Sequence, residues 1–532
     1  MNSKVGYQIL VLHAHLPYVR HKGYSPAFLE ENWLNEAISE TYLPLIKSFR
    51  NLKKENVHFK ITMTFTPTLL SMLDDEYLRD KFLAYLDNLI ELSEKEVKRT
   101  TYDLHLNYLS KFYLDNFHEN RKLFLELNKD VVEGFREFVK DGSLEVITCP
   151  ATHGFLPLLE SEPSSVHAQI HIARKVHKKF WGLEPRGIWL SECAYYPGVE
   201  KFLADEGIRY FFVDTHGIAN ATPRPRYGVY APVEVGNGVF AFARDKESSA
   251  QVWSSIHGYP GDFRYREYYR DIGFDLDYEY IKDYVHPTGI RLNTGIKYHR
   301  ITGKSDYKDY YHPDWAIEAA GNHAEDFMRS RIAQSEKILH EEGQPAIIVS
   351  PYDAELYGHW WYEGPKFIEF LFKKMHFDQD KILAVHPMQV LGLIPRIQSV
   401  KMDMSSWGED GYADVWLNPG NEWIYRHIME CCIIMDQTVH LHKHTEDPTR
   451  RRIINQMARE LLLLQSSDWP FIIKMGTMVD YARKRVNVHT NLFFELTDML
   501  KPDGLNEERL TEIEEEHPIF PEMRFEDFIW KK

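Results

Sequence analysis

The strongest constraint on the fold is a repeated pattern in which a short apolar run is followed by a polar loop and then by a segment with helical periodicity. Apolar runs occur at residues 7–13, 57–65, 144–149, 187–190, 210–213 and 347–350. This alternation predicts an α/β fold built from parallel βα units. In such folds the functional side chains gather at the carboxyl ends of the strands.

Residues of the types that build active sites follow these apolar runs. They are His13, His15, His153, Glu192, Asp214, His216 and Asp353. A single polar residue at a strand end carries little information, because every strand leads into a polar loop. Seven such residues favour one common site at the mouth of the sheet.

Two of these strand ends place a carboxylate among aromatic residues. Glu192 lies close to Trp189 and Tyr195, and Asp353 lies shortly before Trp360. Two carboxylates can divide the roles of acid and nucleophile at a glycosidic bond, and flat rings can hold a sugar face. The pattern predicts a sugar-cleaving site, provided that the two strand ends meet. The simpler interpretation of Glu192 is a carboxylate that caps the next helix.

Composition excludes several classes of function. The formal net charge is −16, which argues against nucleic acid or an anionic membrane surface as the main partner. Aromatic residues make up 14% of the chain, which suits a neutral carbohydrate. We expect no signal peptide and no membrane-spanning segment, because no apolar run approaches the roughly 20 residues needed. The four cysteines show no CxxC spacing, which indicates a reducing, cytoplasmic compartment.

The chain divides into two expected domains. Residues 1–400 are expected to form the catalytic domain, with an inserted, loop-rich subdomain at about 221–304, where Pro, Gly, Tyr and Arg are dense. Long helical patterns at 422–440, 448–465 and 470–497 predict a helical C-terminal domain over 401–532. That this domain contributes to the cleft is implied only by a family resemblance.

Several segments resemble glycoside hydrolase family 57. They are His13-Ala-His15-Leu-Pro17, Trp189-Leu-Ser-Glu192-Cys-Ala-Tyr195 and Tyr352-Asp353-Ala-Glu355-Leu-Tyr-Gly-His359-Trp360. Two later segments, which contain Trp407 and Trp416 and then Asp468, resemble the branch with 1,4-α-glucan branching enzymes. The resemblance implies a distorted (β/α)7 barrel with a small inserted domain and a helical C-terminal domain. It also implies cleavage of an α-1,4 linkage and transfer of the chain to a 6-hydroxyl.

The resemblance implies that Glu192 is the nucleophile and Asp353 the general acid/base of a retaining double displacement. A retaining pair should lie about 5–5.5 Å apart. Glu355 follows Asp353 by two residues and is the rival acid, which we expect to orient or bind substrate.

The expected partner is an α-glucan, with no cofactor and no catalytic metal. The residues expected to bind it are His13, His15, His153, Arg244, Trp253, Gly261, Glu355, His359, Trp360, Trp407, Trp416 and Asp468. Simpler interpretations stay open for some of them. Arg244 could form a surface pair with Asp245, Gly261 could form a turn, and Trp253 could be part of the core. Trp407 and Trp416 could join the two domains. The three histidines could alternatively bind a metal.

Alternative functions also stay open. On the same scaffold the chain could be an α-amylase or a 4-α-glucanotransferase. Outside that class it could be an inactive glucan-binding protein or a metal-dependent polysaccharide deacetylase. The resemblance implies a loop over the cleft with a tyrosine that supports transfer, for which Tyr227 and Tyr230 are the candidates. Residues 227–240 are compact here, which would favour hydrolysis.

Overall fold

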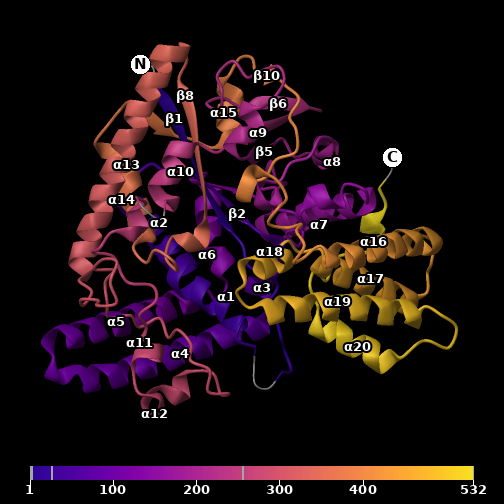
Figure 1. Cartoon of the computed structure of the whole chain (residues 1–532), viewed down its shortest axis with the longest axis horizontal. Coiled ribbons are helices and arrows are strands. Elements are labelled where there is room, and N and C mark those ends of the chain that lie inside the picture. The colour runs from indigo at the N-terminus through magenta and orange to yellow at the C-terminus, as the bar shows by residue number, and fades with distance from the viewer. Residues whose placement is uncertain (1–3, 25–27, 255–256, 531–532) are drawn as a thin grey trace.

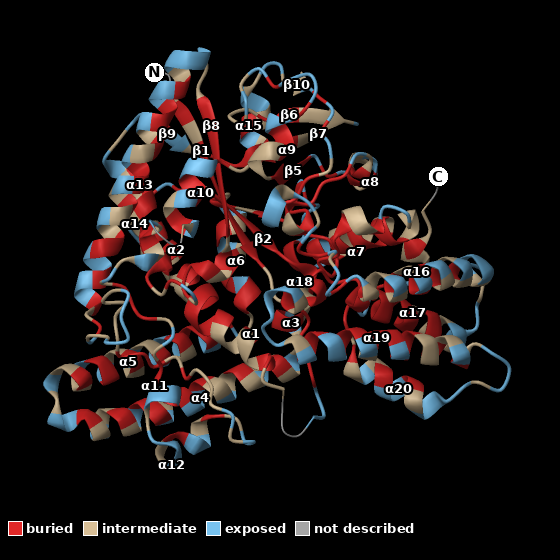
Figure 2. Cartoon of the chain, viewed as in Figure 1, coloured by how far each residue is buried: buried red, intermediate tan, exposed pale blue. Residues whose placement is uncertain are grey.

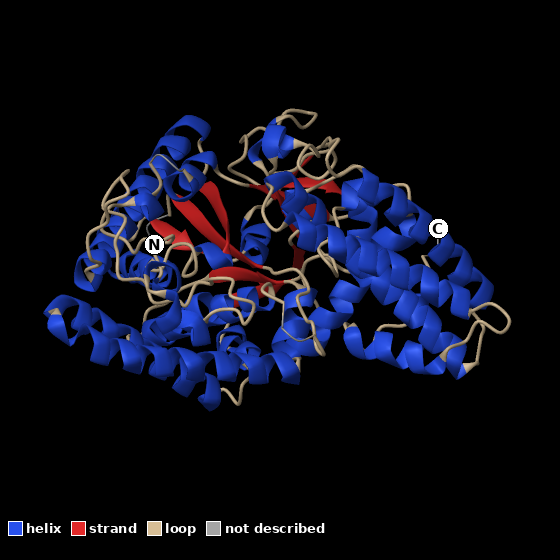
Figure 3. Cartoon of the chain, turned by 60° about the horizontal axis from the view of Figure 1, so that its bottom comes forward, coloured by secondary structure: helices blue, strands red, loops and turns tan. Residues whose placement is uncertain are grey.

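The computed structural model describes residues 4–24, 28–254 and 257–530. Strands lie at the centre and helices surround them (Figure 1), as a second view along the sheet also shows (Figure 3). The strands are β1 (Gly6–Ala14), β2 (Ile61–Phe65), β3 (Leu144–Ile147), β4 (Gly187–Ile188), β5 (Tyr210–Val213), β6 (Val233–Gly236), β7 (Val239–Ala243), β8 (Ala346–Asp353), β9 (Ile382–Ala384) and β10 (Gln398–Ser399).

The strands form two sheets, and hydrogen bonds join the two sheets at two pairs of edges. One sheet has the order β3-β2-β1-β8, with β9 beside the start of β1, and the other has the order β10-β6-β7-β5-β4. Only the β6–β7 pairing is antiparallel. A bridge between Thr148 and Ile188 joins β3 to β4, and the Asp245 amide donates to the Val349 carbonyl at 2.9 Å beside β8. Seven strands thus follow one another around a ring, as a distorted barrel requires.

The helices of the first 400 residues cover this ring. They are α1 (Glu31–Ala37), α2 (Leu43–Lys54), α3 (Pro67–Asp74), α4 (Glu76–Arg99), α5 (Leu104–Glu126), α6 (Val131–Lys140), α7 (Pro163–Trp181), α8 (Val199–Asp205), α9 (Thr215–Ala219), α10 (Lys246–Trp253), α11 (Ile272–Asp275), α12 (Tyr278–Ile281), α13 (Pro313–Glu342), α14 (Gly364–Phe377) and α15 (Pro387–Leu393). Helices beside the strands turn their buried faces to them, whereas α4 and α5 pack against one another in a hairpin that extends away from the strands (Figure 2).

Helix α6 illustrates how the sequence specifies these elements. The Asp130 side chain accepts a hydrogen bond from the Glu133 amide and caps the helix, and Phe135 and Phe138 lie on the buried face. Burial of one such ring contributes on the order of 2–3 kcal/mol.

A π-helical turn at Ile38–Tyr42 interrupts the helix formed by α1 and α2. Such turns are frequent at functional sites, because the extra residue redirects side chains. The backbone of this turn packs against Gly358, where a Cβ atom would lie 1.9 Å from the Glu40 carbonyl oxygen and where φ is +128°. Only glycine is compatible with this contact, so the loop after β8 is fixed against the turn.

The stretch expected to be loop-rich, 221–304, has two parts. Its first part contributes β6 and β7 to the second sheet and then forms α10. Its second part, after α10, has only short helices and turns. The sequence pattern did not separate them, because β6 and β7 have only four and five residues.

The C-terminal helices are α16 (Trp423–His442), α17 (Pro448–Leu464), α18 (Asp468–Met475), α19 (Val479–Met499) and α20 (Glu507–Glu516). They pack beside α3 and α7 in Figure 1. The single helix expected over 470–497 is in fact two helices, α18 and α19. Gly476 ends α18 with φ 77°, and Met478 with φ 52° also departs from helical geometry.

Candidate functional site

The two carboxylates approach the same cluster of rings from two strands. Asp353 ends β8, where it lies opposite His13 of β1 in the strand register. The His13 ring lies 4.8 Å from the Trp189 ring, three residues before Glu192. The charge of Asp353 raises the pKa of Glu192, and the charge of His15 lowers the pKa of both carboxyl groups.

Glu192 lies in a sharp turn, Ser191–Cys193, that follows β4 directly. Its φ is 61° and that of Cys193 is 51°, so two consecutive residues with side chains occupy the left-handed region. Such strain persists only where the surrounding structure fixes it, and it is concentrated at functional sites. The turn aims the Glu192 carboxylate into the cluster instead of along the strand.

The Glu192 carboxylate accepts hydrogen bonds from two residues of the C-terminal third of the chain. Trp407 Nε1 donates to Oε2 at 2.8 Å, and the Ser467 hydroxyl donates to Oε1 at 3.3 Å. Donors of this kind stabilise the ionised carboxylate. Glu192 is therefore held in one orientation by groups more than 200 residues away.

Three histidines form a layer beneath the carboxylates. The His15 and His153 rings stack at 3.8 Å, and His13 Nε2 lies 3.1 Å from His153 Nε2. His15 Nε2 bonds Asp468 Oδ1 at 3.0 Å, and His15 Nδ1 bonds Thr66 Oγ1 at 3.1 Å. Asp468 thus reaches the barrel from the start of α18.

Asp353 and Glu355 have different surroundings. Among the described residues, no side chain donates a hydrogen bond to the Asp353 carboxylate. Glu355 Oε1 accepts from the Tyr42 hydroxyl and from the His15 amide at 3.2 Å. Asp353 is thus free to engage a ligand oxygen, whereas Glu355 is held by the π-helical turn.

Arg244 also reaches the cluster. Its guanidinium pairs with both oxygens of Asp214 at 3.0 Å and lies 5.7 Å from the Trp407 ring. The Arg244 charge lowers the pKa of Asp353. The expectation of a mere surface pair is therefore wrong, because the partner is Asp214 at the end of β5 and the pair faces the site.

Burial dominates the ionisation of the site. It raises the pKa of Glu192 to about 7, opposed by the Trp407 hydrogen bond, and that of Asp353 to about 6. It also raises the pKa of Glu355 to about 7. Burial alone would raise the pKa of Asp468 as well, but the adjacent His15 lowers it to about 2.

The histidines differ in charge. Burial and neighbouring imidazoles lower the pKa of His13 and His153 well below the ordinary value, so both are neutral near pH 7. Burial also acts against the charge on His15, but Asp468 overcomes it, and the pKa of His15 is raised. Of the three imidazoles, only His15 has surroundings that favour the protonated form.

His359 and Trp360 line the next part of the site. His359 Nδ1 bonds Glu40 Oε2 at 2.8 Å, and Tyr268 and His359 Nε2 are 3.1 Å apart. The Trp360 ring stacks on Tyr268 at 4.3 Å and remains 52% exposed. Its free face suits a sugar ring.

Other expected residues are not brought to the carboxylates. In the described part of the chain, no hydrogen bond or ring contact joins Trp253 or Gly261 to Glu192 or Asp353. Trp416 is 1% exposed and stacks on Phe155 at 4.5 Å. The expectation that Trp416 binds substrate is therefore wrong, because no face of its ring is free.

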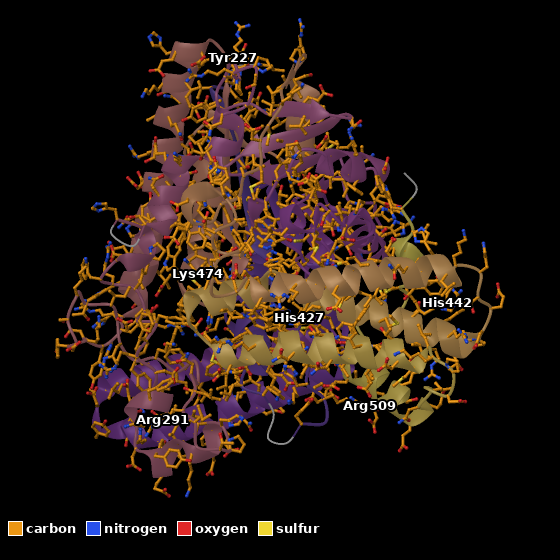
Figure 4. All side chains as sticks on the ribbon, turned by 45° about the vertical axis from the view of Figure 1, so that its right-hand side comes forward. Tyr227, Arg291, His427, His442, Lys474 and Arg509 are labelled. Carbon is orange, nitrogen blue, oxygen red and sulfur yellow. The ribbon has the colours of Figure 1, made fainter. Side chains whose placement is uncertain are left out.

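Tyr227 and Tyr230 do not lie over the carboxylates either. The Ile347 amide donates to the Tyr230 carbonyl at 3.0 Å, six residues before Asp353 on β8, which corresponds to about 20 Å along the strand. In Figure 4, Tyr227 lies at the top of the molecule, well apart from Lys474 on α18. No described hydrogen bond joins either tyrosine to Glu192 or Asp353, so the tyrosine over the cleft stays unassigned.

Sequence reasoning did not find Ser467, Tyr42 or Tyr268. Ser467 adjoins Asp468, so the same segment could have indicated it. Tyr42 and Tyr268 lie in stretches that show no motif. Tyr42 reaches the site because it belongs to the π-helical turn, and Tyr268 because its loop packs against His359.

His15, His153 and Asp468 offer ligand atoms within 4.8 Å of one another, as a metal site would. However, every imidazole nitrogen of this triad already has a partner: Thr66 and Asp468 for His15, and Ser467 and His13 for His153. The arrangement is complete as a hydrogen-bonded network and gives no reason to invoke a metal.

Comparisons with known proteins show which family the chain matches. Residues 9–403 match the family model of glycosyl hydrolase family 57, and residues 427–528 match that of the 1,4-alpha-glucan branching enzyme C-terminal domain. The chain is 35% identical to 1,4-alpha-glucan branching enzyme TK1436 of Thermococcus kodakarensis, over 93% of this chain and 74% of that protein.

Two solved structures are similar over almost the whole chain. The alpha-amylase AmyC from Thermotoga maritima superposes with a TM-score of 0.92 at 43% identity, covering 100% of both chains. The family 57 branching enzyme from Pyrococcus horikoshii superposes with a TM-score of 0.88 at 33% identity, covering 99% of this chain and 97% of that one. None of the helices in the described ranges combines the length and apolar character needed to cross a bilayer.

Proposed function

The chain belongs to glycosyl hydrolase family 57, and we propose that it is a 1,4-α-glucan branching enzyme. The observation that carries this proposal is the match of residues 427–528 to the branching-enzyme C-terminal domain. That domain supplies Ser467 to Glu192 and Asp468 to His15. The relatives named as branching enzymes extend over nearly the full chain.

In the proposed mechanism, Glu192 attacks the anomeric carbon of an α-1,4-linked glucan while Asp353 protonates the leaving oxygen. The bond from C1 to that oxygen breaks, and a β-linked glycosyl–Glu192 ester forms. Asp353 then takes the proton of a 6-hydroxyl on a second chain, whose oxygen displaces Glu192. Two inversions leave an α-1,6 branch with net retention.

The hydrogen bonds support this division of roles. Trp407 and Ser467 donate to Glu192 and localise the negative charge there, whereas Asp353 is free of such donors and can carry the proton. The positive charge of His15 lies beside both groups. Trp407 also covers the site and can exclude water from the ester intermediate.

We also propose the remaining assignments. Residues 1–400 form the catalytic domain and 401–532 the helical domain. His13, His15, His153, Arg244, Glu355, His359, Trp360, Trp407 and Asp468 contact or orient the glucan, with Trp253 and Gly261 further along it. The enzyme acts in glycogen biosynthesis in the cytoplasm, in keeping with four unpaired, buried cysteines in the described chain.

One observation favours a second function, α-amylase. AmyC, which is named an alpha-amylase, is 43% identical. The two activities differ only in the acceptor, which is a sugar 6-hydroxyl or water.

The test is incubation with amylose, followed by counting α-1,6 linkages by NMR and reducing ends by chemical assay. Branching predicts new α-1,6 linkages with few new reducing ends, and Glu192→Gln should abolish them. Reducing ends that accumulate without α-1,6 linkages would instead establish an amylase.

A further inference from the structure

Helix α7 carries a pair of histidines that the proposed reaction does not use. His167 and His171 are four residues apart and therefore lie on one face of the helix. Gln169, between them, points to the opposite side and bonds Thr152 in the core. The histidine pair faces outward, toward the end of α8 and the C-terminal turn Phe525–Phe528.

A carboxylate oxygen completes a triad with this pair. Glu206, just after α8, places Oε1 2.9 Å from His171 Nδ1 and 4.0 Å from His167 Nδ1. All three ligand atoms lie within 4.8 Å of one another. Ligands at about 2.0–2.1 Å from a tetrahedral ion lie about 3.3 Å apart, which falls between the two separations. Rotation of the imidazoles about χ2, a broad torsion, can equalise them.

One ligand atom of the triad has no partner. His167 Nδ1 is buried and accepts or donates no hydrogen bond, because the nearest carboxylate oxygen is 4.0 Å away. Buried polar atoms are satisfied in the great majority of cases, so an orphan atom that faces a carboxylate calls for an explanation. A cation here would give His167 Nδ1 a partner, and Glu206 Oε1 would exchange its 2.9 Å hydrogen bond with His171 Nδ1 for the ion.

The surrounding residues have the arrangement that metal sites use to orient their ligands. His171 Nε2 faces Asp527 Oδ1 at 3.5 Å, and Lys175 holds Asp527 at 2.7 Å. Arg174 Nε donates to Glu206 Oε2 at 2.6 Å, so that Oε1 is the oxygen that faces the two imidazoles. A ligating histidine typically donates its other ring N–H to a carboxylate in this way.

We propose that His167, His171 and Glu206 bind a divalent transition-metal ion of the Zn²⁺ class, with water completing the coordination. Two neutral imidazoles and one carboxylate are ligands that such ions prefer. The ion links α7 to α8 and, through His171 and Asp527, to the C-terminal turn. Its role is structural, and it is separate from the carboxylates that carry the proposed reaction.

The simpler reading is a plain ion-pair cluster, in which a charged His171 bridges Glu206 and Asp527. That reading accounts for His171 but leaves His167 Nδ1 without a partner. The two readings differ in what happens when metal is added, because only a metal site releases a proton from His171 on binding.

The test uses the full-length protein, freed of metal with a chelator, and titrates it with Zn²⁺ by calorimetry and with Co²⁺ by absorption. We expect one ion per chain, the visible absorption of low-coordinate Co²⁺, and a melting temperature that rises with Zn²⁺ concentration. His167→Ala should weaken binding at least tenfold, and Asp527→Asn about 10–100-fold. His440→Ala, an exposed histidine on α16, is the matched control and should bind as the wild type does.

His167 carries no hydrogen bond, so its replacement should leave the fold and the activity on amylose intact. Absence of binding in the wild type would overturn the proposal. Equal Zn²⁺ affinity in His167→Ala would also overturn it, since the ion would then lie elsewhere, for example at His15, His153 and Asp468.

Discussion

Trp407 Nε1 donates a 2.8 Å hydrogen bond to Oε2 of Glu192, across 215 residues of chain. The bond links the segment that begins the C-terminal region to the carboxylate proposed as nucleophile. The Trp407 ring also lies 5.0 Å from Trp189 and 5.7 Å from the guanidinium of Arg244. Trp407 therefore fixes the orientation of the Glu192 carboxylate and stabilises its ionised form. Its ring also packs against two other residues of the site.

Replacing Trp407 with Phe keeps a ring but removes the donor. A hydrogen bond to a charged group contributes about 1.5–3 kcal/mol, so we expect kcat to fall roughly 10–150-fold. Because the donor favours the ionised form, the pKa of Glu192 should rise, and the acidic limb of the pH profile should move to higher pH. Measuring kcat and kcat/KM as a function of pH gives both the fall in rate and the shift of the acidic limb. Trp423→Phe on α16 is the control, and an unchanged acidic limb in Trp407→Phe would contradict the role.

The rate should depend on pH as a bell-shaped curve. Burial raises the pKa of Glu192 to about 7 and of Asp353 to about 6, whereas the mechanism requires Glu192 ionised and Asp353 protonated. This order is opposite to the proposed roles, which rest on the hydrogen bonds to Glu192; the two carboxyl groups titrate as one coupled pair. Below this range both groups are protonated and the nucleophile is lost; above it both are ionised and the acid is lost. We expect maximal kcat/KM near pH 6–7. A flat profile between pH 5 and 8 would argue against this pair.

Asp353 and Glu355 should respond differently to substitution. Removing a general acid costs about 10²–10⁴-fold, so Asp353→Ala should nearly abolish activity on amylose but spare a substrate with a good leaving group, such as a maltotriosyl α-fluoride. Azide should then accelerate turnover and yield an α-glycosyl azide, because it attacks from the face that the acceptor uses. Glu355→Gln should reduce activity less and show no azide rescue. Rescue of the Glu355 variant alone would reverse the two assignments.

Asp468→Asn tests the contribution of the helical domain. Asp468 pairs with His15 at 3.0 Å, and both side chains are largely buried. We expect kcat to fall at least tenfold and the free energy of unfolding to fall by about 1–3 kcal/mol. The exposed Asp480→Asn on α19 is the matched control.

The stability effect of Asp468 should depend on pH. His15 lowers the pKa of Asp468 to about 2, below the roughly 3.9 of an unfolded chain. A depressed pKa contributes stability above the unfolded value, and this contribution is lost as pH falls through 2. Denaturant unfolding of wild type and Asp468→Asn should therefore differ most near pH 6 and converge in strong acid. A constant difference would contradict the ion pair.

The main elements of the fold follow from the sequence pattern. The apolar run at 347–350 lies within β8, and the strand register then places Asp353 opposite His13. Strands β6 and β9 were not anticipated, because three or four residues with mixed burial give no clear periodicity. The break between α18 and α19 was missed because helical periodicity continues through Gly476 and Met478, whose backbone angles are visible only in the structure.

Some residues of the site could likewise be predicted from the sequence, and others could not. Glu192, Asp353, His13, His15 and Asp468 could be named from strand ends and from the family resemblance. Trp416 could not be told apart from Trp407, since both are tryptophans of one segment and only packing buries Trp416 against Phe155. Arg244 could not be assigned a partner, because Asp214 lies 30 residues earlier and meets it only when β5 and β7 pair.

The most direct test of the central proposal is to trap the glycosyl–enzyme ester. Asp353→Ala should react with a maltotriosyl α-fluoride, whose leaving group needs no acid, and then lose the sugar slowly because the base is absent. Rapid quenching, digestion and mass spectrometry should find one maltotriosyl group on the peptide that contains Glu192, and none when Glu192→Gln is added. A maltotriosyl group on any other peptide, or rapid fluoride release in the double variant, would contradict the account.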